Sequence, residues 1–156
     1  MLTLRRTPPI EQATHAGRRG RPVLLATIDA PFDEQAATFA VESALECGQP
    51  LIVANVLEIP LAPLCVAMGY GPLEPSEEAA ANLRAPAELA HSLGVALERL
   101  RILSPHPIDA LLEVVKERGP GLLVFAPDRT AVKPRSYRRA AKKIAAKAPC
   151  LVWLAE

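Results

Sequence analysis

Apolar runs alternate with amphipathic segments along most of the chain, and this alternation predicts strands alternating with helices. The strands are expected at residues 23–29, 51–58, 95–103, 122–126 and 150–154. Most of these are nearly continuous apolar runs, which are typical of strands buried on both faces of a parallel sheet. Residues 95–103 alternate apolar and polar side chains in part, which favours a position near a sheet edge.

The amphipathic segments predict four helices, at residues 33–47, 76–93, 109–118 and from about 136 to 147. Asp33 and Glu34 favour the start of the first helix, and Gly48 marks its end. Ser76 is placed to cap the second helix. Pro86 predicts a kink or a break in that helix, because a proline inside a helix costs about 3 kcal/mol. Residues 59–75, rich in proline, predict a long loop.

Strands that alternate with helices indicate an α/β fold: a parallel sheet with right-handed crossovers and helices on both faces. In such sheets ligands bind at the carboxyl ends of the strands. Asp29 ends the first strand, and residues 127–135 form the loop after the fourth. The sequence therefore predicts a ligand site at this edge. For Asp29 the pattern leaves two roles open, a contact with a ligand or a hydrogen bond to the following loop.

Composition narrows the class of protein. The 156 residues predict one domain over residues 21–156, preceded by a basic flexible tail over residues 1–20. Half of the residues are hydrophobic but only 4% are aromatic, so we expect an aliphatic core. The chain shows neither a long uncharged apolar run nor the apolar middle of a signal peptide. We therefore expect a cytoplasmic protein that does not enter a membrane.

Cysteine and histidine offer little chemistry. The three cysteines are Cys47, Cys65 and Cys150, which are widely spaced and form no C-x-x-C pair. Neither a disulfide framework nor a metal site is expected, and Cys150 lies in an apolar run as a small buried hydrophobe would. His91 and His106 stand next to no cysteine or carboxylate that would suggest a catalytic dyad. No catalytic residue is predicted.

A basic segment is the strongest chemical signal in the chain. Residues 129–147 contain eight basic residues and no acidic one, although the formal net charge of the whole chain is only +1. One interpretation is a solvated helix face. A second is an anion site whose side chains are Arg129, Lys133, Arg135, Ser136, Arg138 and Arg139. A third is nucleic-acid binding, for which Tyr137 is the one aromatic residue placed to stack on a base.

The chain resembles the universal stress protein family over about residues 21–156. The resemblance rests on the order and spacing of VLLATID, HPIDALLEVVKERGPGLLVFA and AAKKIAAKAPCLVWL. It implies a Rossmann-like three-layer fold with five parallel strands in the order 3-2-1-4-5, and it puts Asp29 near the adenine or ribose of a bound nucleotide. It also implies a homodimer formed through the last strand. Leu151, Val152 and Trp153 are then the expected interface residues, with core packing of Trp153 as the alternative.

Some members of this family bind ATP through a motif G-x2-G-x9-G after the fourth strand. In this chain the three glycine positions hold Ala126, Arg129 and either Arg138 or Arg139. Pro127 and Pro134 also enter the segment, and a proline has no N–H to offer a phosphate. The resemblance therefore implies weak or absent binding of ATP, or of AMP, and no firmly held cofactor.

These observations favour a dimeric, non-enzymatic module of stress response or regulation that acts on a protein partner or senses a small anion. The alternative is a protein that binds ATP or AMP through its arginine-rich loop and hydrolyses ATP slowly, if at all. A third hypothesis is a nucleic-acid-associated protein. The missing glycines favour the first over the second, and the few aromatic residues and low net charge weigh against the third.

Overall fold

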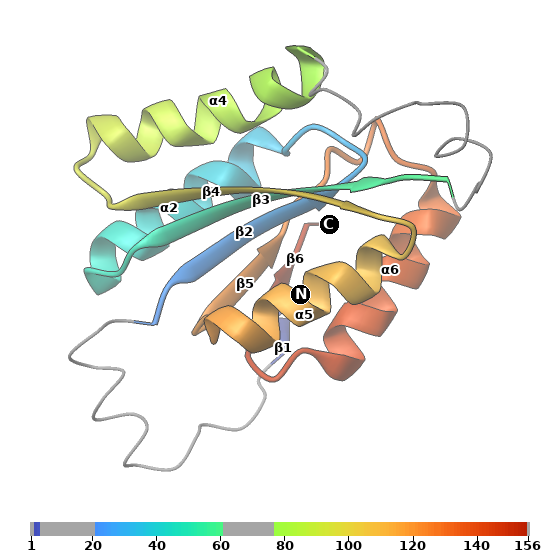
Figure 1. Cartoon of the computed structure of the whole chain (residues 1–156). Coiled ribbons are helices and arrows are strands. Elements are labelled where there is room, and N and C mark those ends of the chain that lie inside the picture. The colour runs from blue at the N-terminus through green and yellow to red at the C-terminus, as the bar shows by residue number, and fades with distance from the viewer. Residues whose placement is uncertain (1, 4–20, 61–76, 156) are drawn as a thin grey trace.

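The computed structural model describes residues 2–3, 21–60 and 77–155, with a parallel sheet at the centre (Figure 1). The parallel strands are β2 (Val23–Ile28), β3 (Leu51–Glu58), β4 (Leu97–Ser104), β5 (Leu122–Phe125) and β6 (Leu151–Leu154). They lie in the order β4-β3-β2-β5-β6, which confirms the expected order 3-2-1-4-5. As expected for a partly alternating strand, β4 lies at one edge.

The opposite edge carries an additional strand. Leu2–Thr3 form β1, which pairs antiparallel with β6 so that Leu2 lies opposite Trp153 and Thr3 opposite Val152. Both residues belong to the segment that was expected to be a flexible tail, and residues 4–20 lie outside the described residues. An edge strand presents unpaired N–H and C=O groups, and β1 pairs with those of β6.

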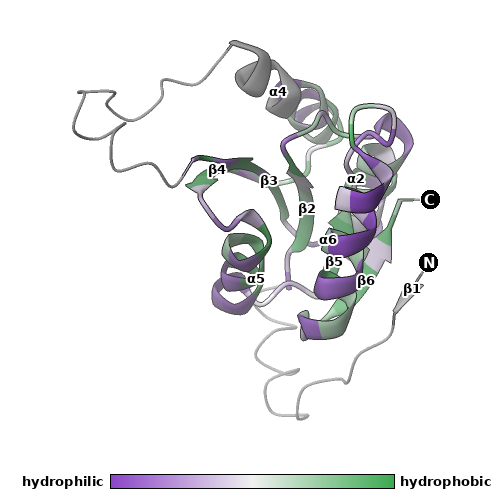
Figure 2. Ribbon diagram, turned by 90° about the vertical axis from the view of Figure 1, so that its right-hand side faces the viewer, coloured by the Kyte–Doolittle hydropathy of each residue, from purple (hydrophilic) through white to green (hydrophobic). Residues whose placement is uncertain are grey.

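Helices cover both faces of the sheet (Figure 1). One face packs against α2 (Glu34–Cys47) and α4 (Glu77–Ser92), and the other against α5 (Pro107–Arg118) and α6 (Pro134–Lys147). Figure 2 shows hydrophobic residues along the strands and hydrophilic residues along the outer sides of α5 and α6. Each face thus has its own core, which is mostly aliphatic, as the composition predicts.

The predicted ends of the first helix are confirmed. The Asp33 carboxylate accepts a 2.8 Å hydrogen bond from the N–H of Ala36 and so caps α2. Gly48 follows the helix with φ +63°, a conformation that costs glycine little and terminates the helix.

Three helix predictions need correction, and each involves a proline. Of the kink or break expected at Pro86, the break is wrong, because α4 runs through this residue as one helix. Ala87 and Ala90 are buried against the sheet there, and this packing offsets the lost backbone hydrogen bond. Helices α5 and α6 begin at Pro107 and Pro134, two residues earlier than expected. Proline suits the first turn of a helix, where its missing N–H would have no partner within the helix.

Candidate functional site at the carboxyl ends of the strands

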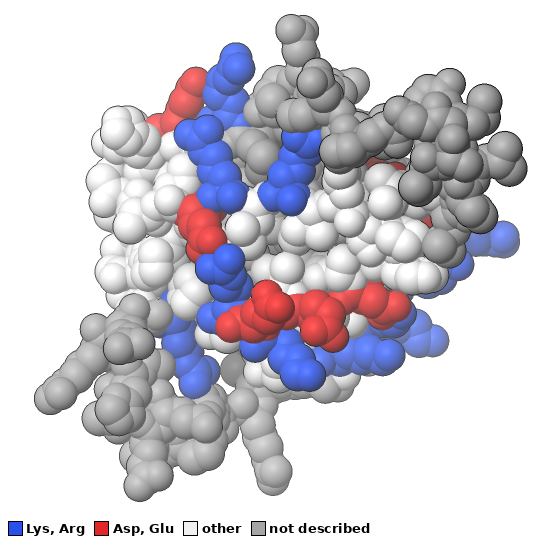
Figure 3. Space-filling model, viewed as in Figure 1, with Lys and Arg blue, Asp and Glu red and all other residues white. Residues whose placement is uncertain are grey.

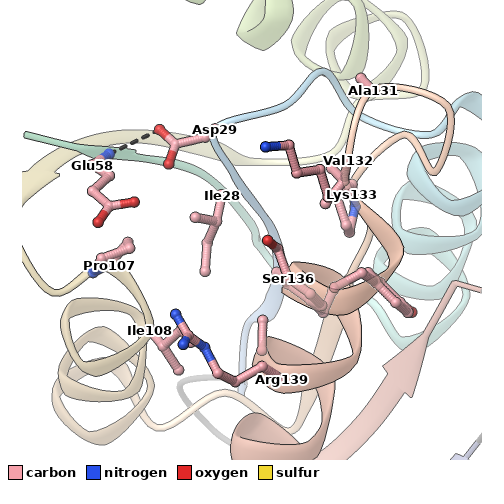
Figure 4. Close-up of a pocket in the computed structure, with 14 residues that line it drawn as sticks. Ile28, Asp29, Glu58, Pro107, Ile108, Ala131, Val132, Lys133, Ser136 and Arg139 are labelled. Atoms are coloured by element: carbon pink, nitrogen blue, oxygen red, sulfur yellow. Dashed lines mark hydrogen bonds between the residues drawn. The ribbon is translucent and has the colours of Figure 1, made fainter.

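A pocket of about 240 Å³ opens at the carboxyl ends of β2, β3 and β5, where the sequence predicts a ligand site (Figure 4). The first turns of α5 and α6 close its other sides. Its lining combines apolar and charged side chains: Ile28, Asp29, Glu58, Pro107, Ile108, Phe125, Pro127, Ala131, Val132, Lys133, Ser136, Tyr137, Arg139 and Ala140. The pocket thus brings together four of the seven predicted site residues, namely Asp29, Lys133, Ser136 and Arg139.

Asp29 joins two strands at the pocket wall. Its φ of +50° lies in the left-handed region, which aspartate tolerates better than most residues. Its backbone N–H donates to the carbonyl of Val56 at 2.9 Å, and its Oδ1 accepts a 2.8 Å hydrogen bond from the N–H of Glu58. The side chain therefore bonds to the end of β3 rather than to the loop that follows it. The same carboxylate lines the pocket.

Sequence reasoning missed Glu58. This exposed residue ends β3, and Figure 4 shows its carboxylate on the side of the pocket above Pro107. The sequence pattern that points to Glu58 is the same one that points to Asp29: an acidic residue at the end of an apolar strand. This pattern indicates a shared site only when β3 is known to lie beside β2 in the sheet.

The opposite wall comes from α6. Lys133 precedes the helix, and Ser136 and Arg139 follow at intervals of three residues, so all three face the same side. Lys133 makes no side-chain capping hydrogen bond, and Pro134 at the first position offers no N–H. Donors on this wall are thus supplied largely by side chains rather than by a cradle of backbone amides.

The charges around the pocket are balanced. Asp29 and Glu58 lie at the strand ends, and Lys133 and Arg139 extend into the pocket from α6, the Lys133 amine towards Asp29 and the Arg139 guanidinium beside Ile108 (Figure 4). Within the described part of the chain, none of these four side chains forms an ion pair. The ion pairs found there are Arg118–Glu98 at 2.9 Å and Lys143–Asp109 at 2.6 Å, both outside the pocket. The pocket charges are therefore available to a ligand.

Arg129 lies elsewhere. Its guanidinium stacks on the ring of Tyr137, 3.7 Å from the centroid, and donates to the carbonyl of Ala155 at 3.3 Å. Tyr137 is itself buried, stacks on Phe125 with centroids 5.9 Å apart, and donates its hydroxyl proton to the same carbonyl. Arg129 does not line the pocket, whereas Tyr137 does, with a buried ring that already contacts Phe125 and Arg129.

The remaining basic residues lie on the outer side of α6. Tyr137, Ala140, Ala141 and Ile144 form its buried face. Arg135 and Arg138 are exposed and do not line the pocket. Figure 3 shows acidic side chains gathered over α5 with Lys and Arg along the neighbouring α6. Lys143 of α6 bonds Asp109 of α5 across this boundary and lowers the pKa of that carboxyl.

The expected interface residues on β6 differ in exposure. Leu151 is partly buried and Val152 fully buried, while Trp153 packs on Phe39 with ring centroids 5.0 Å apart. The outer backbone edge of β6 is paired with β1. The side chain of Val152 is thus covered by residues of its own chain.

The sequence also raised the questions of reactive cysteines, metal sites and membrane spans. Burial raises the pKa of the Cys150 thiol to about 11, and Cys47 is exposed. Among the described residues, no group of three or more histidine, cysteine, aspartate or glutamate side chains could hold a metal ion. None of the described helices is long and apolar enough to cross a membrane.

Comparison with known proteins places the chain in a family. The model of the universal stress protein family matches residues 20–155. No curated protein sequence matches significantly.

Solved structures share the fold at low identity. A universal stress protein family member from Burkholderia pseudomallei is 18% identical with a TM-score of 0.62, over 86% of this chain and 95% of that one. One from Archaeoglobus fulgidus, in complex with dAMP, is 18% identical with a TM-score of 0.60, over 88% and 99%. One from Arabidopsis thaliana, with AMP bound, is 16% identical with a TM-score of 0.52, over 85% and 89%. Since the family model covers nearly the whole chain, the protein belongs to the universal stress protein family.

Proposed function

We propose that this protein is a non-enzymatic regulatory module of the stress response that binds a nucleoside monophosphate in the pocket at the strand ends. One observation carries the proposal: two carboxylates, two cations and a hydroxyl line a single pocket. The dAMP and AMP complexes of the similar structures support the choice of ligand class.

The chemistry of the two walls assigns an orientation to such a ligand. Asp29 and Glu58 accept hydrogen bonds, so they suit the amino group of a base or the hydroxyls of a ribose. Lys133, Ser136 and Arg139 donate, and a charged donor binds a phosphate oxygen more strongly than a neutral one does. The base or sugar therefore lies on the strand side, and the phosphate on the α6 side.

The same walls disfavour tight binding of ATP. Two cations line the pocket, and they are balanced by two carboxylates. Arg129 is engaged with Tyr137 and Ala155, and Arg135 and Arg138 lie outside the lining. The alternative hypothesis requires an arginine-rich loop that binds the phosphates. The side chains available for this in the pocket are Lys133, Ser136 and Arg139. We infer weak binding of ATP and no turnover.

Calorimetric titration with AMP and ATP tests this proposal. Lys133→Ala and Arg139→Ala should each weaken AMP binding about tenfold, since each removes a charged hydrogen bond to the phosphate. Arg135→Ala and Arg138→Ala are matched controls, because they remove the same kind of charge from the same helix outside the pocket. Equal losses in all four variants, or no AMP binding to the intact protein, would reject the proposal. Phosphate release from ATP above the buffer rate would reject its non-enzymatic part.

The proposal also includes a homodimer formed through β6. Its support is the position of β6 near the end of the sheet, with Leu151 and Trp153 only partly buried. Because β1 pairs with the outer edge of β6, a partner strand can take that edge only when β1 leaves it.

A further inference from the structure

We propose that Glu58 sets the charge selectivity of the pocket: it admits nucleosides and monophosphates and repels ligands with further phosphates. This inference rests on the proposed function, since it concerns how the same pocket ranks nucleotides. It goes beyond that proposal by assigning the ranking to one residue on the strand side, opposite the cations.

The backbone of Glu58 is held firmly at the pocket wall. Its N–H donates to Oδ1 of Asp29 at 2.8 Å, and it lies opposite Ser104 in the β3–β4 ladder. Directly after it, the N–H of Ile59 donates to the carbonyl of Ser104 at 3.1 Å. The carboxylate itself is exposed to the pocket, and within the described part of the chain it has no ion-pair partner. The backbone from which Glu58 extends its negative charge is therefore fixed at the pocket wall.

The cations around the pocket do not offset the negative charge of Glu58 for a ligand with several phosphates. Lys133 and Arg139 balance Asp29 and Glu58, so the lining has no net positive charge. The nearest further cations by sequence, Arg129, Arg135 and Arg138, do not line the pocket. A single phosphate placed beside Ser136, between Lys133 and Arg139, is attracted by both cations. Each further phosphate adds negative charge without another cation, and its repulsion by Glu58 grows in proportion to the ligand charge.

The substitution Glu58→Gln isolates this charge. Glutamine keeps the size of the side chain, and the hydrogen bond to Asp29 is made by the backbone N–H and does not depend on the side chain. Because the residue is exposed, the variant should fold as the unaltered protein does. Glu113→Gln is the matched control, since Glu113 is exposed on α5 and does not line the pocket.

The experiment compares the dissociation constants of adenosine, AMP and ATP for the three proteins at low and high salt. Glu58→Gln should tighten ATP binding about tenfold, AMP about threefold and adenosine less than about twofold. The gains should shrink at high salt, and Glu113→Gln should change none of the three constants by more than about twofold.

The outcomes separate the inference from the proposed function. AMP binding that persists while Glu58→Gln shifts all three ligands equally, or shifts none, would overturn the inference and leave the proposed function standing. An equal ATP gain in Glu113→Gln would also overturn it, since the effect would then come from overall charge. Failure of AMP and ATP to bind any of the proteins would overturn both.

Discussion

The carboxylate of Asp29 accepts a 2.8 Å hydrogen bond from the backbone N–H of Glu58, 29 residues further along the chain. This bond joins the ends of β2 and β3 and places both carboxylates on one wall of the pocket. The residue that orders the strand ends is thus also a candidate ligand contact.

We expect Asp29→Ala to lower the free energy of unfolding by about 1–3 kcal/mol. It removes the acceptor of the Glu58 N–H and puts alanine in the left-handed region. Asp29→Asn should lose less, because its amide oxygen accepts and asparagine tolerates this conformation. Urea unfolding measures both. An Asp29→Ala protein as stable as the original would show that the bond contributes nothing.

Arg129 should prove structural rather than ligand-binding. Arg129→Ala removes the contact with the Tyr137 ring and a hydrogen bond to Ala155, so we expect a loss of about 1–2 kcal/mol in stability. AMP affinity should stay within about twofold, in contrast to the loss expected for Arg139→Ala. Thermal or urea unfolding combined with titration separates the two effects. A large loss of AMP affinity without a loss of stability would show instead that Arg129 contacts the ligand.

Cys150 should make stability fall at alkaline pH. Burial raises the pKa of its thiol from 9.0 to about 11, so the thiol of the unfolded chain ionises first. Stability from this group is present below pH 9 and is lost as the pH rises towards about 11. The difference in unfolding free energy between the original protein and Cys150→Ala should therefore narrow over this window. A difference independent of pH would contradict the assignment.

Removing residues 1–20 should promote dimer formation. The shortened chain lacks β1, so the outer edge of β6 is open to the same strand of a second copy. Light scattering of both chains over a range of concentrations measures this, with a lower dimer dissociation constant expected for the shortened one. If both remain monomeric at high concentration, β6 is not a dimer interface.

Much of the fold could be predicted because the signals are local. Apolar runs bounded by turn residues predicted the strands, and Asp33 and Gly48 predicted the ends of α2 through hydrogen bonds and backbone angles close in sequence. The break predicted at Pro86 is absent because burial of Ala87 and Ala90 against the sheet outweighs the local cost of the proline in the helix. Local propensity is a weak guide where tertiary packing acts on the same residues.

By itself the sequence determined the alternation of strands and helices, the edge at which the candidate pocket opens, and the choice of Asp29 and the start of α6 as candidate contacts. Only the tertiary structure decided which charges share the pocket. It brought Glu58 beside Asp29 through the pairing of β2 with β3, and it turned Arg129 towards Tyr137 and Ala155. The physical reason is that such contacts join residues far apart in the chain, whose proximity depends on strand order and on the direction of each side chain rather than on local propensity.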